Sequence, residues 1–222
     1  MSFQKTAGVA GIVAALLFVV NFLAQGQPEA ADASAADIVK YAVDNSGGIK
    51  LAMGAGTVLL LPLLFWGAGV MGRLRDAGGE GAAWGATGYG ALVLAGALFA
   101  SANLIWLPIV VTPGVRGDDS LVAFMWASVY VIGAAAFVAI AAVLLAFSCG
   151  GLRCGVGARW LNWLGIVGGV VALIGGAWPE ASAKGDLLGA VGIPGYLIFV
   201  VWVLITGIEL VRAVPADTAA AE

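Results

Sequence analysis

The chain has 222 residues, of which 62% are hydrophobic and 10% are charged, whereas soluble domains have about 45–50% and about 25%. So few charges cannot coat a soluble globule, so the chain belongs in a membrane, where six spans with short loops leave no room for a second domain. The net charge of −3 and the lack of a basic run argue against nucleic acid as a partner.

The sequence contains no histidine, and this excludes several kinds of chemistry. Bis-histidine haem, most zinc hydrolases and the usual general base all need an imidazole. The two cysteines, Cys149 and Cys154, lack the spacing of a common metal or redox motif, so we expect free thiols in a cytoplasmic loop. The sequence therefore predicts no catalytic, metal-binding or cofactor-binding residue, and we expect a protein that is not an enzyme.

The first apolar segment, residues 6–23, follows Lys5 and resembles a signal peptide in its positive start and apolar middle. Its apolar stretch is longer than the roughly 7–15 residues of a signal-peptide core. This length favours a retained membrane helix.

Residues 25–50 form the longest predicted loop and contain one strong local pattern. Ser34 and Asp37 resemble a capping box. The apolar residues after Ser34 recur at helical spacing, and they are Ala35, Ile38, Val39, Ala42 and Val43. We expect a short amphipathic helix at 34–46 that lies in the membrane interface and ends at Asn45-Ser46-Gly47-Gly48. A lid over a cavity is the alternative.

Five further apolar segments follow, at about residues 49–71, 86–111, 121–147, 160–178 and 187–211. A helix needs about 20 residues to cross a hydrocarbon core of about 30 Å. The sequence therefore predicts an all-α polytopic membrane protein: one six-helix transmembrane bundle over residues 1–222, with the short interfacial helix between its first two spans. Residues 213–222 are expected to form a flexible cytoplasmic tail.

Prolines and tryptophans add detail to the predicted spans. Pro62, Pro108 and Pro194 are expected to bend their helices, and Thr57 is expected to compensate for the carbonyl that Pro62 frees. Six tryptophans fall near predicted span ends, as in an aromatic belt; they are Trp66, Trp84, Trp106, Trp126, Trp160 and Trp178.

Positive charges predict the orientation. If the N-terminus is inside, six basic residues face the cytoplasm, namely Lys5, Arg73, Arg75, Arg153, Arg159 and Arg212. The other four face outwards, and they are Lys40, Lys50, Arg116 and Lys184. We therefore expect a plasma-membrane protein with both termini in the cytoplasm.

Polar side chains gather in the predicted outer half of the bundle, where facing lipid would be costly. Eight residues form a candidate ligand pocket, and they are Asn21, Gln25, Ser101, Asn103, Trp106, Trp126, Tyr130 and Tyr196. Asn103 and Trp106 lie one turn apart on the same helix face, which makes them the first candidates. Hydrogen bonding between helices is the alternative explanation for these polar groups.

Two other features of the spans invite an explanation. Glu209 is the one acid embedded in a span, and we expect it to form an ion pair with Arg212 or Arg73 and not a proton relay. Gly165, Gly169 and Gly176 belong to overlapping small-xxx-small steps. These steps predict close packing within the chain or, alternatively, contact with a membrane-protein partner or a second copy.

Two stretches carry a family resemblance: SAADIVKYAVDNSGGI at 34–49 and WGAGVMGRLRDAGG at 66–79. With the apolar helix before them, they resemble a group of actinobacterial multi-pass membrane proteins of unassigned function, over about residues 8–80. Asn45 stands where that group is expected to have histidine. The resemblance implies about six helices and no particular activity.

These patterns favour a non-enzymatic membrane protein whose pocket holds a membrane lipid or a small apolar molecule. An accessory subunit of a larger membrane complex is the alternative. A small-molecule transporter or an intramembrane enzyme is less favoured, because no buried pair of acids and no nucleophile–base pair is evident. A continuous cavity lined by Asn103, Trp106, Trp126 and Tyr196 would favour binding, and dry close packing there would favour the accessory role.

Overall fold

The computed structural model describes residues 2–184 and 187–212, and within these ranges every regular element is a helix. Six helical rods in this part of the chain are long and apolar enough to cross a membrane. The rods are α1 (Phe3–Ala24), α3 with α4 (Ser46–Val58 and Leu60–Asp76), α5 with α6 (Gly81–Ile105 and Leu107–Val111), α7 (Asp119–Cys154), α8 (Arg159–Gly176) and α11 (Gly192–Arg212). The prediction of an all-α, six-helix membrane bundle is confirmed.

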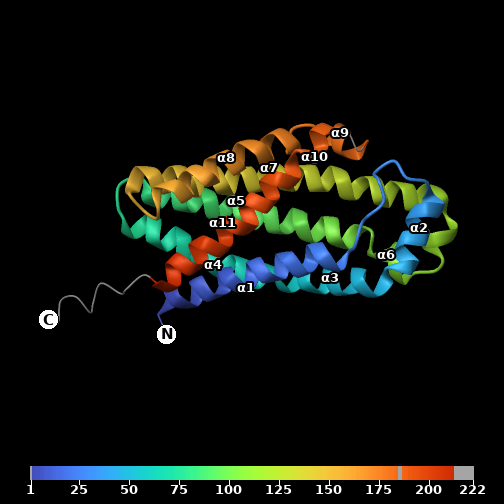
Figure 1. The fold of residues 1–222 in the computed structure, drawn as a ribbon, viewed down its shortest axis with the longest axis horizontal. Helices are drawn as coiled ribbons and strands as arrows, with labels where there is room; N and C mark the ends of the chain where they lie inside the picture. Colours follow the sequence, from blue (N-terminus) through green and yellow to red (C-terminus); the bar gives the residue numbers. More distant parts are fainter. Residues whose placement is uncertain (1, 185–186, 213–222) are drawn as a thin grey trace.

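The rods lie side by side, and α1 begins at the same end of the bundle where α11 finishes (Figure 1). We call this end the terminal end. The short helix α2 (Ala35–Asp44) crosses the opposite end, which we call the α2 end. The other short elements are η1 (Val115–Gly117), α9 (Pro179–Ala183) and α10 (Leu187–Ala190). The predicted tail at 213–222 lies outside the described residues.

Two predicted boundaries are wrong. Helix α7 continues to Cys154, so Cys149 and Cys154 lie in its last turns and not in a loop, although both are free thiols as predicted. The segment predicted to begin at residue 187 is divided, since α10 and a turn precede α11, which begins at Gly192. Apolar composition alone could not show either difference.

The three prolines that were predicted to bend their helices stand near the beginnings of helical segments. Pro62 is the third residue of α4, after a break at Leu59, and Pro108 is the second residue of α6. Pro194 is the third residue of α11, in its first turn. It therefore does not bend the helix, and the expectation of a bend is wrong. A first-turn residue needs no N–H donor, which is why proline is tolerated there. The Thr57 hydroxyl donates to its own preceding turn, at the Met53 carbonyl, and does not compensate for Pro62.

Glycines let the helices approach closely in the terminal half of the bundle. A Cβ atom on Gly8 of α1 would lie 2.6 Å from the carbonyl oxygen of Gly207 in α11. A Cβ atom on Gly69 of α4 would likewise overlap Ala7. Helix α1 is therefore in direct backbone contact with both α4 and α11.

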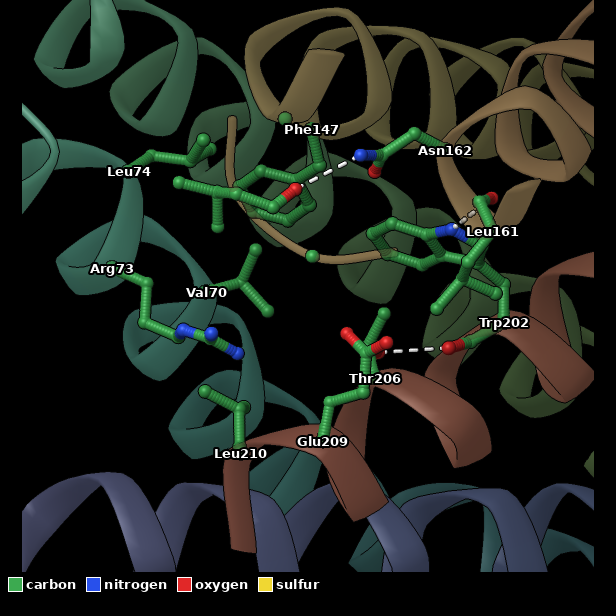
Figure 2. A pocket seen from close by; sticks show the side chains of 13 residues that line it. Val70, Arg73, Leu74, Phe147, Leu161, Asn162, Trp202, Thr206, Glu209 and Leu210 are labelled. Carbon is green, nitrogen blue, oxygen red and sulfur yellow. Dashed lines mark hydrogen bonds between the residues drawn. The ribbon is translucent and has the colours of Figure 1, made fainter. Parts of the chain in front are cut away.

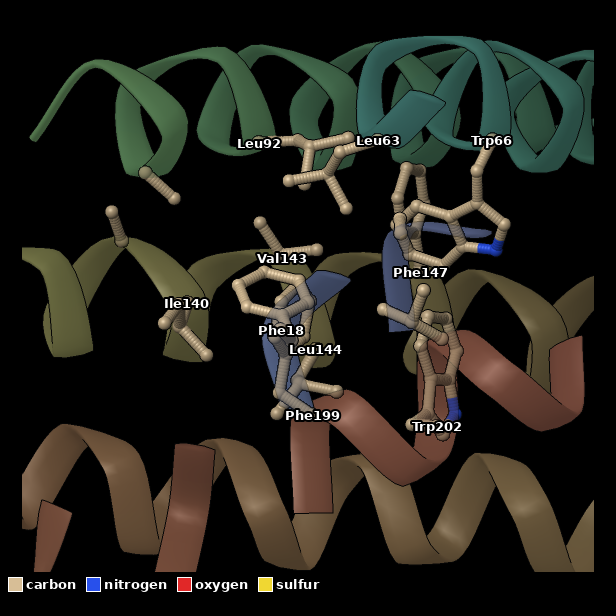
Figure 3. Packing of buried hydrophobic residues seen from close by; sticks show 14 of the residues in the cluster. Phe18, Leu63, Trp66, Leu92, Ile140, Val143, Leu144, Phe147, Phe199 and Trp202 are labelled. Atoms are coloured by element: carbon tan, nitrogen blue, oxygen red, sulfur yellow. The ribbon is translucent and has the colours of Figure 1, made fainter. Parts of the chain in front are cut away.

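Large aromatic side chains fill the centre of this half (Figure 3). The Trp66 ring packs edge-on against Trp202, with centroids 5.7 Å apart, and Phe147 stacks on Trp202 at 6.3 Å. Trp66 is fully buried and its indole N–H donates to the Thr206 hydroxyl over 3.0 Å. Its prediction as a belt residue is therefore wrong. Trp160 and Trp178, at the two ends of α8, remain about half exposed as a belt requires.

The glycine stripe of α8 packs within the chain. Gly165 faces Ser148, Gly169 faces the Ala141 carbonyl, and Gly176 faces Ala134, all on α7. Packing within the chain, the first of the two predicted alternatives, accounts for all three glycines. A partner would have to dock on another face.

Helix α11 crosses the bundle obliquely, from α1 at the terminal end towards α7 and α8 at the other (Figure 1). Its first residues pack away from α1, since Gly192 contacts Phe137 of α7 and Gly195 contacts Ala172 of α8. Phe18 still joins α1 to α11, because its ring lies 5.5 Å from Tyr196 and 5.8 Å from Phe199. Beyond Phe18, the two helices part.

Candidate ligand-binding pocket

A cavity of about 230 Å³ occupies the space where α1 and α11 part. This exceeds the roughly 150 Å³ of an apolar cavity that accommodates benzene. Its polar wall residues are Asn21, Gln25, Asn103 and Tyr196. The larger apolar residues of its wall include Phe22, Phe99, Trp106, Phe137, Ile140 and Ile193. The wall thus has the composition of a small-molecule site, mostly apolar with a few polar groups.

The cavity opens sideways, towards the surface that the lipid would cover. Phe22 of α1 and Ile193 of α11 both belong to the wall, yet they are 51% and 45% exposed. They stand on the two helices that part, so the opening lies between α1 and α11. A molecule dissolved in the bilayer can reach such an opening without crossing water.

Three amide side chains form a hydrogen-bonded row along one wall. Asn21 donates to the Ala52 carbonyl of α3 over 2.7 Å and to the side-chain oxygen of Asn103 over 3.4 Å. Gln25 donates to the side-chain oxygen of Asn21 over 3.3 Å. Asn103 donates to the Phe99 carbonyl over 2.7 Å. The same amides therefore join α1, α3 and α5 and also line the cavity.

Tyr196 provides a polar group without a protein partner. It is 9% exposed and lies on the cavity wall, and its hydroxyl makes no hydrogen bond with any residue in the described ranges. The fully enclosed side-chain polar atoms without a partner in the described residues are those of Ser148 and Ser182, so the Tyr196 hydroxyl is an accessible one. It is thus an unused donor on a residue of the cavity wall.

Five of the eight predicted pocket residues line this cavity, and three do not. Ser101 is exposed on the opposite face of α5, where its hydroxyl donates to the Ala97 carbonyl. Two residues along a helix correspond to a rotation of about 200°, so Ser101 and Asn103 cannot share a face. Trp126 and Tyr130 lie on α7 in a separate cluster at the α2 end.

That separate cluster holds the segment between α1 and α2 in place. Three aromatic side chains donate to carbonyls of this segment: Tyr41 to Gln25 and Tyr130 to Glu29, both over 2.7 Å, and Trp126 to Ala30 over 3.0 Å. We call residues 25–44 the cap. Residues 25–34 of the cap belong to no helix or strand, and side chains bind three of their backbone carbonyls.

Trp106 connects the cap to the cavity. Its ring stacks on Tyr41 at a centroid distance of 6.2 Å and packs edge-on against Trp126 at 5.3 Å, while it also lines the cavity. Helix α2 itself contributes nothing to the cavity wall, so it covers the end of the bundle and not the lateral opening. Two residues thus link the cap to the cavity: Trp106, which stacks on Tyr41, and Gln25, which belongs to both the cap and the cavity wall.

Helix α2 begins as predicted and buries part of the predicted face, together with Tyr41. The Ser34 hydroxyl accepts from the Asp37 backbone N–H over 3.2 Å, so Ser34 is the N-cap residue of α2, as predicted. The buried residues are Ile38, Tyr41 and Ala42, whereas Val43 is 44% exposed and was wrongly predicted to be on the buried face. Helix α3 begins at Ser46, so the two glycines predicted to end α2 belong to α3. Burial, together with the nearby Tyr130 and Glu29, raises the pKa of Tyr41 to about 12.

A second, much smaller cavity lies in the terminal half, near Glu209 (Figure 2). Its volume of about 30 Å³ has room for one or two waters. The Glu209 carboxylate accepts from the Ala158 backbone N–H over 3.4 Å, at the start of α8, where a helix favours negative charge. Among the described residues it forms no ion pair within 4.0 Å, so the expected pairing with Arg73 or Arg212 is wrong.

Sequence reasoning missed the apolar wall of the lateral cavity. Wall residues such as Phe99, Phe137 and Ile193 do not stand out in the sequence, because apolar residues fill every span. One signal for Phe99 was present. It lies one turn before Asn103, so helical spacing puts it on the face predicted for Asn103 and Trp106.

Comparison of the chain with protein-family models, curated proteins and solved structures gives no match.

Proposed function

We propose that this protein binds a membrane lipid or a small apolar molecule in the lateral cavity between α1 and α11. The observation that carries the proposal is the sideways opening beside Phe22 and Ile193, which leads to an apolar wall with a few polar groups. Dry, close packing at this position would have favoured an accessory role instead. Asn103, Trp106 and Tyr196 line an open space there.

The cavity wall supports binding and not catalysis. It consists of amides, one tyrosine, one tryptophan and apolar side chains, and no acid, base or cysteine belongs to it. An active site needs a nucleophile with a base, or an acid with a base, within hydrogen-bond reach. We therefore propose a non-enzymatic role for this cavity.

We place the protein in the plasma membrane with the terminal end in the cytoplasm. Six of its ten basic residues belong to the terminal end, and an excess of basic residues is typical of the cytoplasmic side. The lateral cavity would then lie in the outer half of the bilayer. Cysteine tags at Lys40 and Arg75, in a chain without its two native cysteines, should react from opposite sides of intact cells.

Filling the cavity tests the binding proposal. Gly133 lies on the cavity wall and a Cβ there meets nothing within 4 Å, so Gly133→Phe places a ring in the cavity without disturbing the backbone. Gly90 is an exposed helical glycine with equally open space, so Gly90→Phe is the matched control. In native mass spectrometry of the purified protein, we expect the wild type and Gly90→Phe to retain a bound molecule that Gly133→Phe loses. Equal retention by all three would refute the proposal.

A further inference from the structure

We infer that the lateral cavity takes an uncharged lipid that carries a carbonyl oxygen, such as a prenylated quinone or a diacylglycerol. The inference rests on the proposed function and adds the chemistry of the ligand. It follows from three properties of the described wall: its lack of charge, its unused hydrogen-bond donors and its aromatic surface.

Charge comes first. No acidic or basic side chain lines the cavity, and an unpaired charge is costly to bury in an apolar site. The neighbouring cap carries Glu29 and Asp32 and has no basic residue before Lys40. An anionic headgroup would find no cation on the cavity wall, so the ligand is uncharged.

The donors left over in the cavity define the polar group of the ligand. Asn21 uses both hydrogens of its amide and Gln25 donates back to Asn21. Asn103 donates one hydrogen to Phe99 and keeps the other, and the Tyr196 hydroxyl keeps its hydrogen. These two donors come from α5 and α11. A carbonyl oxygen, which accepts two hydrogen bonds, complements them.

The remaining wall suits either a planar ring or an acyl chain. Phe99, Trp106 and Phe137 present aromatic surface from α5 and α7, and aromatic rings stack on flat ligands as readily as they pack against methylene groups. The side-chain oxygen of Gln25 adds an acceptor, which a diacylglycerol hydroxyl can use and a quinone cannot. The shared chemistry is thus a neutral carbonyl lipid with two sources.

The test measures the affinity of the purified full-length protein for four probes: a short-chain prenyl quinone, dioctanoylglycerol, the hydrocarbon squalene and dioctanoyl phosphatidylglycerol. We expect one of the first two to bind more tightly than the last two. Tyr196→Phe should lower the affinity for that carbonyl probe by roughly three- to tenfold, because one hydrogen bond is lost. Its affinity for squalene should stay within about twofold of the wild type. Tyr89→Phe, which removes a hydroxyl from a tyrosine outside the cavity wall, should change neither.

The outcomes separate the inference from the function on which it rests. If squalene or phosphatidylglycerol bound at least as tightly as the carbonyl probes and Gly133→Phe abolished that binding, the result would overturn the ligand chemistry and leave the cavity as the site. Unchanged carbonyl affinity in Tyr196→Phe would also overturn the chemistry. If Gly133→Phe altered the binding of no probe, the cavity itself would fail as the site. The preferred carbonyl probe identifies the source.

Discussion

The two ends of the bundle are built differently from the same six helices. In the terminal half, Gly8 and Gly207 bring backbones into contact, Trp66 fills the centre, and the interior cavity beside Glu209 measures about 30 Å³. In the other half, α1 and α11 part around about 230 Å³, and side-chain hydrogen bonds to carbonyls hold the cap. Close packing supplies stability at one end, so the other end can keep an open, partly polar space. Four predictions test this division, in order of decreasing effect.

Trp66→Ala should be the most damaging change. Trp66 is fully buried, its indole bonds to Thr206, and truncating a buried tryptophan typically costs about 3–5 kcal/mol. The free energy of unfolding by SDS in mixed micelles measures this loss. Trp163 is 52% exposed, so Trp163→Ala should cost less than about 1 kcal/mol. Equal losses would break the distinction between a dense core and a lipid-facing surface.

Gly8→Leu should separate α1 from α11 at the terminal end. The added Cβ would lie 2.6 Å from the Gly207 carbonyl oxygen and 2.7 Å from the Val211 backbone nitrogen, and neither can move aside cheaply. Overpacking of this kind typically costs about 1–3 kcal/mol. The same unfolding assay applies, with Gly54→Leu as the control, since a Cβ at Gly54 meets nothing within 4 Å. A stable Gly8→Leu protein would contradict the close contact.

Tyr41→Phe should loosen the cap and leave the terminal half unchanged. The change removes the hydrogen bond from the Tyr41 hydroxyl to the Gln25 carbonyl, which should lower the stability of the docked cap by about 1 kcal/mol. Amide hydrogen exchange should become about fivefold faster over residues 25–45, while exchange in α4 stays the same. Faster exchange throughout the bundle would mean that the two ends are not energetically separate.

Alkaline pH should produce the smallest effect, again confined to the cap. The pKa of Tyr41 is about 12 in the folded protein and 10.0 in the unfolded chain, so below pH 10 the tyrosine is neutral in both and cap stability is complete. As pH rises from 10 towards 12, the unfolded form gains stability by releasing its proton, so the docked cap loses stability, by less than about 1 kcal/mol at pH 10.5. Exchange over residues 25–45 between pH 9 and 10.5, corrected for the intrinsic rate, measures this loss, and it should be smaller in Tyr41→Phe, in which the Tyr130 hydroxyl still binds the cap.

The fold could be predicted from the sequence because a single strong signal carried it. Long apolar segments form helices in lipid, since no other open structure satisfies the backbone there. Breaks inside a span were harder to predict. Pro62 and Pro108 marked two of them, but the start of α11 depends on how Gly192 packs against Phe137, which no local pattern reveals.

The candidate site could be predicted only where polarity contrasted with the apolar background. Asn21, Gln25 and Asn103 were found because amides in a span need partners. Trp126 was placed in the wrong site, because its indole satisfies the Ala30 carbonyl of the cap, a contact 96 residues apart in sequence. The resemblance to actinobacterial membrane proteins and the cytoplasmic location of the termini stay predictions.

The glycine contact between α1 and α11 has a mechanical consequence. A stiff rod that is clamped near one tip acts as a lever, and the 13 residues from Gly8 to Asn21 give it an arm of about 20 Å. A swing of about 5° at the clamp would displace Asn21 by about 1.7 Å, more than a carbon–carbon bond length. Such a swing would widen the lateral opening between α1 and α11 for a bulkier ligand, while the terminal half would hardly move.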